Sequence, residues 1–168
     1  MKIVTGGQTG VDRAALDAAL ESGVKAGGWC PEGRVAEDGI IPDRYPLLGL
    51  SRAGYRQRTR RNVIDSDGTA IIYFGHPEGG TEQTIAYCIK ERKPYLLIDA
   101  EEVSIERAAG RIERFVASHS IAVLNVAGPR ASGESRAYAY ARKLILSVLR
   151  IISRHSVNNQ DGLFGRML

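Results

Sequence analysis

The chain has 168 residues, which is enough for one domain with a core of its own. Its two cysteines argue against a secreted disulfide framework and predict a reducing, cytoplasmic location. No apolar run is long enough for a signal peptide or a membrane-spanning helix. The net charge of +4 favours anionic partners but does not choose between nucleic acid and a small phosphate ester.

Short β-rich runs alternate with longer helical runs, which predicts βαβ units and a mostly parallel sheet in an α/β domain. The stretch 31–54 has little periodicity, and irregular segments of this length are often functional. We expect one domain over residues 1–155 and a loosely ordered C-terminal tail over 156–168. The predicted strands are 2–5, 24–30, 69–74, 94–98 and 121–126; the predicted helices are 11–22, 55–64, 81–91, 105–118 and 132–153.

A glycine-rich loop joins the first predicted strand to the first helix. Unbonded backbone N–H groups at a helix start, together with the helix dipole, favour an anion there. The glycine spacing matches neither the Walker pattern nor the dinucleotide fingerprint. Asp12 is either a ligand contact or a plain N-cap. The positive charge of Arg13 is unfavourable at a helix start, so it suggests a phosphate bound between the helix start and the Arg13 side chain. The candidate residues are Gly6, Gly7, Gln8, Thr9, Gly10, Asp12 and Arg13.

Two further loops have the same strand-to-helix position. In the second, Glu82 is either a site residue or a charge that suits the helix start, and His76 is either a base or a solvated residue. In the third, Arg130 can bind a phosphate bidentately, and Ser132 is a natural N-cap. The candidate site residues are Gly75, Gly79, Gly80, Thr81 and Glu82 in the second loop and Asn125, Gly128, Pro129, Arg130 and Ser132 in the third.

All three loops follow strands of a parallel sheet, so we expect them at one edge, where open α/β sheets bind ligands. Three amide-rich helix starts at one edge imply an anionic ligand with more than one phosphate-like group. Arg34, Glu37 and Asp38 leave the second strand at that edge and are further candidates. Cys30 is either small core packing or a metal contact, and no cluster has a recognised zinc spacing.

Five arginines fall within ten residues between positions 52 and 61. This run is either a solvated helix face or a contact for a ligand or a second subunit. Aromatic residues are not interleaved with the arginines as a base-stacking surface requires, so nucleic-acid binding is the least favoured function. The arginines are Arg52, Arg56, Arg58, Arg60 and Arg61.

These motifs resemble the molybdenum cofactor carrier family, which belongs to a wider group with the Lonely-guy, lysine-decarboxylase-like phosphoribohydrolases. The resemblance spans about residues 1 to 150. It rests on 6–13 (GGQTGVDR), 28–31 (GWCP), 34–39 (RVAEDG), 58–59 (RT), 62–63 (NV), 66–69 (SDGT), 79–81 (GGT) and 124–130 (LNVAGPR). It implies a Rossmann-like three-layer sandwich, a homo-oligomer (dimer or tetramer) and a phosphate-bearing pterin, the molybdenum cofactor, as ligand. It implies no metal bound directly by a protein cluster.

The sequence departs from the phosphoribohydrolase motif at one position that distinguishes a binding protein from an enzyme. The phosphoribohydrolases carry a PGGxGTxxE motif with a catalytic glutamate, and here Thr84 stands where that glutamate would be. Glu82 lies about 200° round the helix from that position at roughly 100° per residue. We therefore favour a carrier over the alternative, a nucleotide-processing hydrolase that uses Glu82, Asp38 or Glu37 as acid or base.

Overall fold

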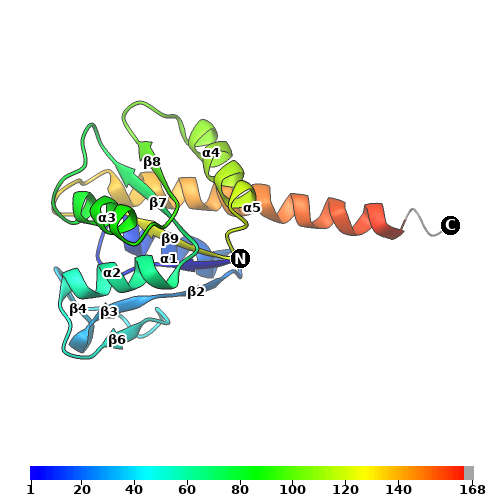
Figure 1. Cartoon of the computed structure of the whole chain (residues 1–168). Helices are drawn as coiled ribbons and strands as arrows, with labels where there is room; N and C mark the ends of the chain where they lie inside the picture. The colour runs from blue at the N-terminus through cyan, green and yellow to red at the C-terminus, as the bar shows by residue number, and fades with distance from the viewer. Residues whose placement is uncertain (165–168) are drawn as a thin grey trace.

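The computed structural model describes the backbone of residues 1–164 and the side chains of residues 1–154. Its centre is a five-stranded, fully parallel sheet with the strand order β2-β1-β9-β7-β8 (Figure 1). The predicted α/β class and the mostly parallel sheet are therefore confirmed. The strands are β1 (Lys2–Val4), β2 (Lys25–Gly27), β7 (Gly68–Tyr73), β8 (Tyr95–Asp99) and β9 (Val123–Ala127).

Helices cover both faces of this sheet, as the side chains of β7 show. Ala70 and Ile72 belong to the main core, which α1, α4 and α5 complete. Ile71 points to the other face and packs with Val63 of α2 and Cys88 of α3. Successive strand residues point to opposite faces, so this alternation fixes the three-layer sandwich. The helices are α1 (Val11–Glu21), α2 (Tyr55–Asp65), α3 (Gly79–Lys90), α4 (Ile105–Ser118) and α5 (Ala137–Phe164).

The stretch after β2 is more ordered than the sequence suggests. It forms two small two-stranded sheets and a 3₁₀ turn around a core of its own, in which Ile41, Tyr45 and Leu47 pack with Leu16 of α1. We call residues 29–50 the excursion. Its elements are β3 (Trp29–Pro31), η1 (Glu32–Arg34), β4 (Val35–Ala36), β5 (Gly39–Ile40) and β6 (Leu48–Leu50).

The predicted strand 24–30 is wrong as a single element, because the chain breaks at Gly28. Gly28 has φ +125°, and a Cβ there would lie 2.1 Å from the backbone oxygen of Thr5. Only glycine tolerates both the conformation and the close approach. β2 therefore stays in the central sheet, and β3 pairs with β6 in the excursion.

The predicted start of the last helix is also wrong. Helix α5 begins at Ala137, so Ser132 is not its N-cap. The helix continues through residues 156–164, which we assigned to a loose tail, and residues 165–168 of that tail lie outside the described residues. Among the described residues, no helix has the length and apolar character needed to cross a membrane.

Candidate functional site

The three loops predicted to share one edge of the sheet do meet there. Together with α2 they surround a cavity of about 620 Å³, a size typical of small-molecule sites. We call it the α2–α3 cavity. Its lining comes from the loop after β1 (Gly6, Gln8, Asp12), from α2 (Tyr55, Arg56, Arg58, Thr59, Asn62), from the β7–α3 junction (Tyr73, Phe74, His76, Glu78, Gly79, Gly80, Thr81, Gln83, Thr84) and from β9 and the loop after it (Asn125, Val126, Ala127, Gly128, Pro129, Arg130, Gly133, Glu134).

The N-terminus of α3 presents unbonded donors to this cavity. Within the described part of the chain, the N–H groups of Gly79 and Gly80 donate no hydrogen bond, and the N-cap Glu78 makes no capping bond with its side chain. The side chain of Glu78 instead contacts His76. Thr81 is only 5% exposed, and among these residues its hydroxyl has no hydrogen-bond partner. Free amides, a free hydroxyl and the positive end of the helix dipole are groups that favour an anion beside a helix start.

Helix α2 contributes a buried cation that faces the same space. Arg58 Nη1 lies 3.2 Å from Asp12 Oδ2, and both side chains are mostly buried. The guanidinium of Arg58 packs directly on Gly6, where a Cβ would lie 1.4 Å from Nη1. Arg58 Nε is buried without a partner, and Nη2 donates no hydrogen bond to any described residue. Burial raises the pKa of Asp12, while the charge of Arg58 and the Gln8 N–H act against that rise.

Several amides of the loop after β1 are already bonded, whereas the sequence led us to expect open amides there. Gln8 N–H donates to Asp12 Oδ2 at 3.2 Å, and Thr9 N–H donates to Gln8 Oε1 at 3.0 Å. Val11 N–H donates to the backbone oxygen of Pro129 at 3.2 Å. The carboxylate of Asp12 thus occupies part of the anion-binding position that the sequence predicted for a ligand. Asp12 is not an N-cap, since that position is held by Gly10.

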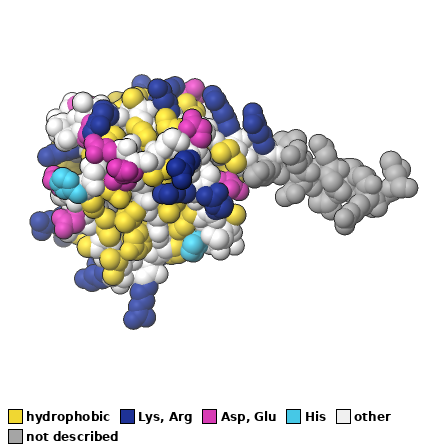
Figure 2. All heavy atoms as spheres, turned by 90° about the horizontal axis from the view of Figure 1, so that it is seen from above, with side chains coloured by type: hydrophobic (Ala, Val, Ile, Leu, Met, Phe, Trp, Pro, Cys, Tyr) yellow, Lys and Arg dark blue, Asp and Glu magenta, His cyan; other side chains and the backbone are white. Residues whose placement is uncertain are grey.

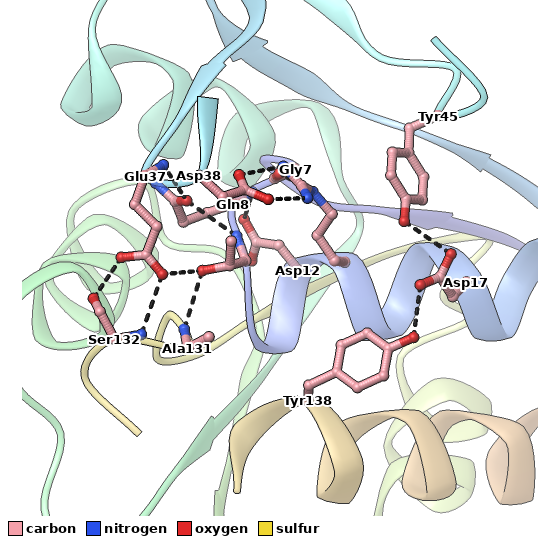
Figure 3. Close-up of polar contacts among 12 residues, drawn as sticks. Gly7, Gln8, Asp12, Asp17, Glu37, Asp38, Tyr45, Ala131, Ser132 and Tyr138 are labelled. Carbon is pink, nitrogen blue, oxygen red and sulfur yellow. Dashed lines mark hydrogen bonds and ion pairs between the residues drawn. The ribbon is translucent and has the colours of Figure 1, made fainter. Parts of the chain in front are cut away.

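A second internal carboxylate occupies the loop after β9. Glu37 accepts hydrogen bonds from the Ser132 N–H at 3.1 Å and from the hydroxyls of Ser132 and Thr9 (Figure 3). Arg130 Nε lies 3.5 Å from the same carboxylate. Partial desolvation opposes any fall in the pKa of Glu37, but the hydrogen bonds from Ser132 and Thr9 outweigh it and lower that pKa. Thr9 and Ser132, predicted as ligand contacts, therefore bind the excursion.

Two of the predicted phosphate-binding arginines also hold the excursion. Arg13 donates to both carboxylate oxygens of Asp38, at 2.7 and 2.9 Å, and to the backbone oxygen of Gly7. Arg34 donates to the four backbone oxygens of Ile41, Pro42, Tyr45 and Leu47. Neither Arg13 nor Arg34 lines the α2–α3 cavity, so the predicted contact of these two side chains with a ligand has no support from this cavity.

The predicted site residues divide into two groups. Glu82 is exposed on α3 and does not line the cavity, which agrees with its predicted displacement round the helix. The predicted residues that line the cavity are Gly6, Gln8, Asp12, Gly79, Gly80, Thr81, Asn125, Gly128, Pro129 and Arg130; those that do not are Gly7, Thr9, Gly10, Arg13, Arg34, Asp38, Gly75, Glu82 and Ser132.

Helix α2 lines one wall of the cavity, which the sequence did not predict. Tyr55, Arg58, Thr59 and Asn62 recur at the spacing of one helix face, and this periodicity is the signal that could have identified them. The arginine run is therefore of mixed character. Arg58 and Arg56 line the cavity, whereas Arg60 and Arg61 form surface ion pairs with acidic residues.

Cys30 lies in the small core of the excursion, and burial raises the pKa of its thiol. Among the residues that the structure describes, no group of three His, Cys, Asp or Glu side chains could hold a metal ion. The burial of Cys30 in this core supports its packing interpretation.

Comparison with known proteins identifies the family of this domain. The model of the circularly permuted YpsA SLOG family matches residues 3–149. The chain belongs to this family. A crystal structure from Syntrophus aciditrophicus SB, named "Putative molybdenum carrier protein", is similar at 45% sequence identity with a TM-score of 0.86. The match covers 88% of this chain and 94% of that chain. None of the curated proteins compared with this chain matches it.

Proposed function

We propose that this protein is a carrier that binds a phosphate-bearing ligand in the α2–α3 cavity, and that the ligand is the pterin of molybdenum cofactor. The observation that carries the proposal is the open N-terminus of α3. Its two glycine N–H groups and the Thr81 hydroxyl have no partners among the described residues and face a cavity large enough for one such molecule.

Cations on the opposite wall complement this anion-binding surface. Arg58 is held in place by Asp12 with Nη2 unbonded, and Arg56 on the same helix makes no ion pair with any described residue. A phosphate between α2 and the start of α3 would receive hydrogen bonds and charge from both sides. Arg130 also lines the cavity, from the loop after β9. Its guanidinium contacts Glu37 and could bind a further anionic group of the ligand at the same time.

The identity of the ligand rests on relatives and on the donor set. The similar structure is named a molybdenum carrier, and the sequence motifs resemble that family. The described residues offer no cluster that would coordinate a metal. We therefore infer that the protein binds the phosphate and the pterin ring of the cofactor, and that the cofactor's own dithiolene group coordinates the metal. The predicted cytoplasmic location remains a prediction.

Calorimetry and thermal unfolding test this function with three probes: molybdenum cofactor, nucleoside monophosphates and inorganic phosphate. Thr81→Val keeps the side-chain shape and removes the free hydroxyl, so we expect affinity for the cofactor to fall by about tenfold. Thr84→Val is the matched control, because Thr84 lines the same cavity but its hydroxyl already donates to the Gly80 oxygen at 2.8 Å. Equal affinities for Thr81→Val and the wild-type protein would contradict the proposed site, and failure of all three probes to bind would overturn the function.

The alternative, a nucleotide hydrolase, needs an acid or base in the cavity. Glu82, Glu37 and Asp38 lie outside it, and the carboxylates that line it are Asp12, Glu78 and Glu134. Release of free base from nucleoside monophosphates, abolished by Glu134→Gln or Glu78→Gln, would favour the hydrolase. We expect no turnover.

A further inference from the structure

The surface charge of the molecule does not distinguish one phosphate-bearing ligand from another. The chain carries a net charge of +4, and on the face seen in Figure 2 lysine and arginine side chains are spread out with acidic side chains between them. Charge distributed in this way attracts anions in general. Selection between such ligands therefore depends on polar groups inside the α2–α3 cavity.

Buried polar side chains in the cavity wall are the groups that can select a ligand, because each of them needs a hydrogen-bond partner. Among the described residues, five polar residues that line the cavity are no more than 5% exposed: Asp12, Asn62, Thr81, Thr84 and Asn125. Asp12, paired with Arg58, and Thr81 belong to the proposed phosphate site.

Two of the other three side chains are engaged within the protein. The Asn62 amide accepts a hydrogen bond from the Trp29 N–H at 2.8 Å and donates one to the Trp29 oxygen at 2.9 Å. The Thr84 hydroxyl donates to the Gly80 oxygen at 2.8 Å. Asn125 is therefore the buried polar residue of the wall that remains for the rest of the ligand.

Asn125 lies on the floor of the cavity, in the strand β9. Leu124 and Val126 pack into the main core on the other face of the sheet, so the Asn125 side chain points toward α2 and α3. Ala127, the last residue of β9, is two residues further along the strand, which is a distance of roughly 7 Å. Asn125 thus lies deeper in the cavity than the sheet edge at which α3 begins.

The side-chain amide of Asn125 presents an acceptor to the cavity. Nδ2 donates to Thr69 Oγ1 at 3.3 Å, whereas Oδ1 accepts no hydrogen bond from a described residue. Asn125 is only 3% exposed, yet its Oδ1 is not enclosed: within the described chain, the one side-chain polar atom that is both fully buried and unbonded is Arg58 Nε. Oδ1 therefore opens into the cavity and needs a donor from the ligand. A carbonyl oxygen repels a phosphate, so the donor belongs to another part of the ligand.

We propose that Asn125 determines the ring specificity of this cavity, and that its Oδ1 accepts a hydrogen bond from the exocyclic amino group of the ligand's ring. This inference rests on the proposed function, since it takes the ligand to be a phosphopterin whose phosphate lies at the start of α3. A pterin carries this amino group, whereas an oxygen replaces it in a lumazine. Two facing carbonyl oxygens share no hydrogen, so the site favours the pterin and rejects the lumazine.

Calorimetry with hydroxymethylpterin phosphate, hydroxymethyllumazine phosphate and inorganic phosphate tests this selection. We expect the wild-type protein to bind the pterin phosphate at least about tenfold more tightly than the lumazine phosphate. Asn125→Leu removes the acceptor at similar side-chain size. It should weaken the binding of the pterin phosphate by about tenfold and leave the affinities for the lumazine phosphate and inorganic phosphate unchanged.

Two further variants separate selection from folding. Asn125→Asp keeps an acceptor at this position, and Thr84→Val changes a hydroxyl of the same cavity that is already bonded, so both should keep the preference for the pterin phosphate. Circular dichroism of each variant checks the fold, and the comparison of the two ring phosphates in the wild-type protein needs no variant.

The outcomes distinguish this inference from the carrier function. Equal wild-type affinities for the two ring phosphates, a preference for the lumazine phosphate, or equal losses for both in Asn125→Leu would overturn the role of Asn125 and leave the carrier function standing. Failure of every probe to bind would overturn both.

Discussion

The Asp12–Arg58 ion pair links the loop after β1 to helix α2. The carboxylate bonds the amide of Gln8 in the loop after β1, and its charge fixes Arg58 on the wall of the α2–α3 cavity. A buried ion pair is costly to desolvate, and the cost is offset only if further hydrogen bonds are made. Arg58 Nε lacks such a bond within the described structure, which is consistent with a site arranged for a ligand rather than for stability.

Gly6→Ala is predicted to weaken ligand binding by about tenfold, because the new Cβ would meet Arg58 Nη1 at 1.4 Å and displace the guanidinium. Calorimetry with the cofactor measures the change. Gly49→Ala is the control, since its Cβ would make only an ordinary contact of 3.9 Å. Unchanged affinity in Gly6→Ala would show that Arg58 does not contact the ligand.

Glu37 is predicted to stabilise the fold in a pH-dependent way. Hydrogen bonds lower its pKa below the ordinary 4.5, so its contribution is fully present above that pH and is lost as the pH falls through the lower folded value. The difference in unfolding free energy between the wild-type protein and Glu37→Gln should be constant near neutral pH and shrink below about pH 4.5. Denaturant titrations across this range measure it. A pH-independent difference would contradict the prediction.

At the scale of elements, α1 and α3 both begin at glycine-rich segments of the same edge. Several amides before α1 are bonded, whereas the N–H groups of Gly79 and Gly80 donate to no described residue. The loop after β9 lies against the start of α1, where a Cβ on Gly10 would be 2.4 Å from the oxygen of Pro129. That approach and the side chains of Gln8 and Asp12 use the N–H groups of Gln8, Thr9 and Val11. No comparable segment of the described chain covers the start of α3, which is why the proposed ligand site is placed there.

Gly28→Ala is predicted to destabilise the fold by about 1–3 kcal/mol, because the residue has φ +125° and no room for a Cβ beside Thr5. Urea unfolding measures the change. Gly110→Ala is the contrasting control: it lies within α4, and the added methyl should stabilise by about 0.5–1 kcal/mol. If both substitutions have the same sign, steric exclusion at Gly28 is not the cause.

At the scale of the whole molecule, four segments that are far apart in the sequence line the cavity: the loop after β1, helix α2, the β7–α3 junction and the loop after β9. A ligand that binds only the folded state stabilises it by about 2.7 kcal/mol at a hundred times its dissociation constant. For a chain of this size we predict a rise of about 5–10 °C in the unfolding midpoint. The rise should shrink with added salt, and it should depend less on salt in Arg56→Gln, since Arg56 is an exposed cation. A salt-independent shift would argue against phosphate recognition.

Local patterns were sufficient to predict most of the architecture. The alternation of strands and helices fixed the fold class, and helix 105–118 matches α4 residue for residue. Because every loop after a strand of a parallel sheet lies at one edge, the meeting of Gly6, Gly80 and Gly128 at one cavity also followed from the sequence.

Tertiary structure alone decided which charged groups face that cavity. The sequence predicts Arg13 as a phosphate ligand and leaves the role of Arg58 open, but Asp38, 25 residues from Arg13, pairs with it. Glu37 reaches Ser132 across 95 residues and occupies the loop after β9. Strand and helix periods are local properties, whereas the partner of a long polar side chain depends on which distant segment packs beside it. The sequence by itself determined that the glycine-rich loops meet at one edge of the sheet. Packing of the excursion decided that Arg13 and Glu37 pair within the fold, so the proposed anion site is left to the start of α3 and to Arg58.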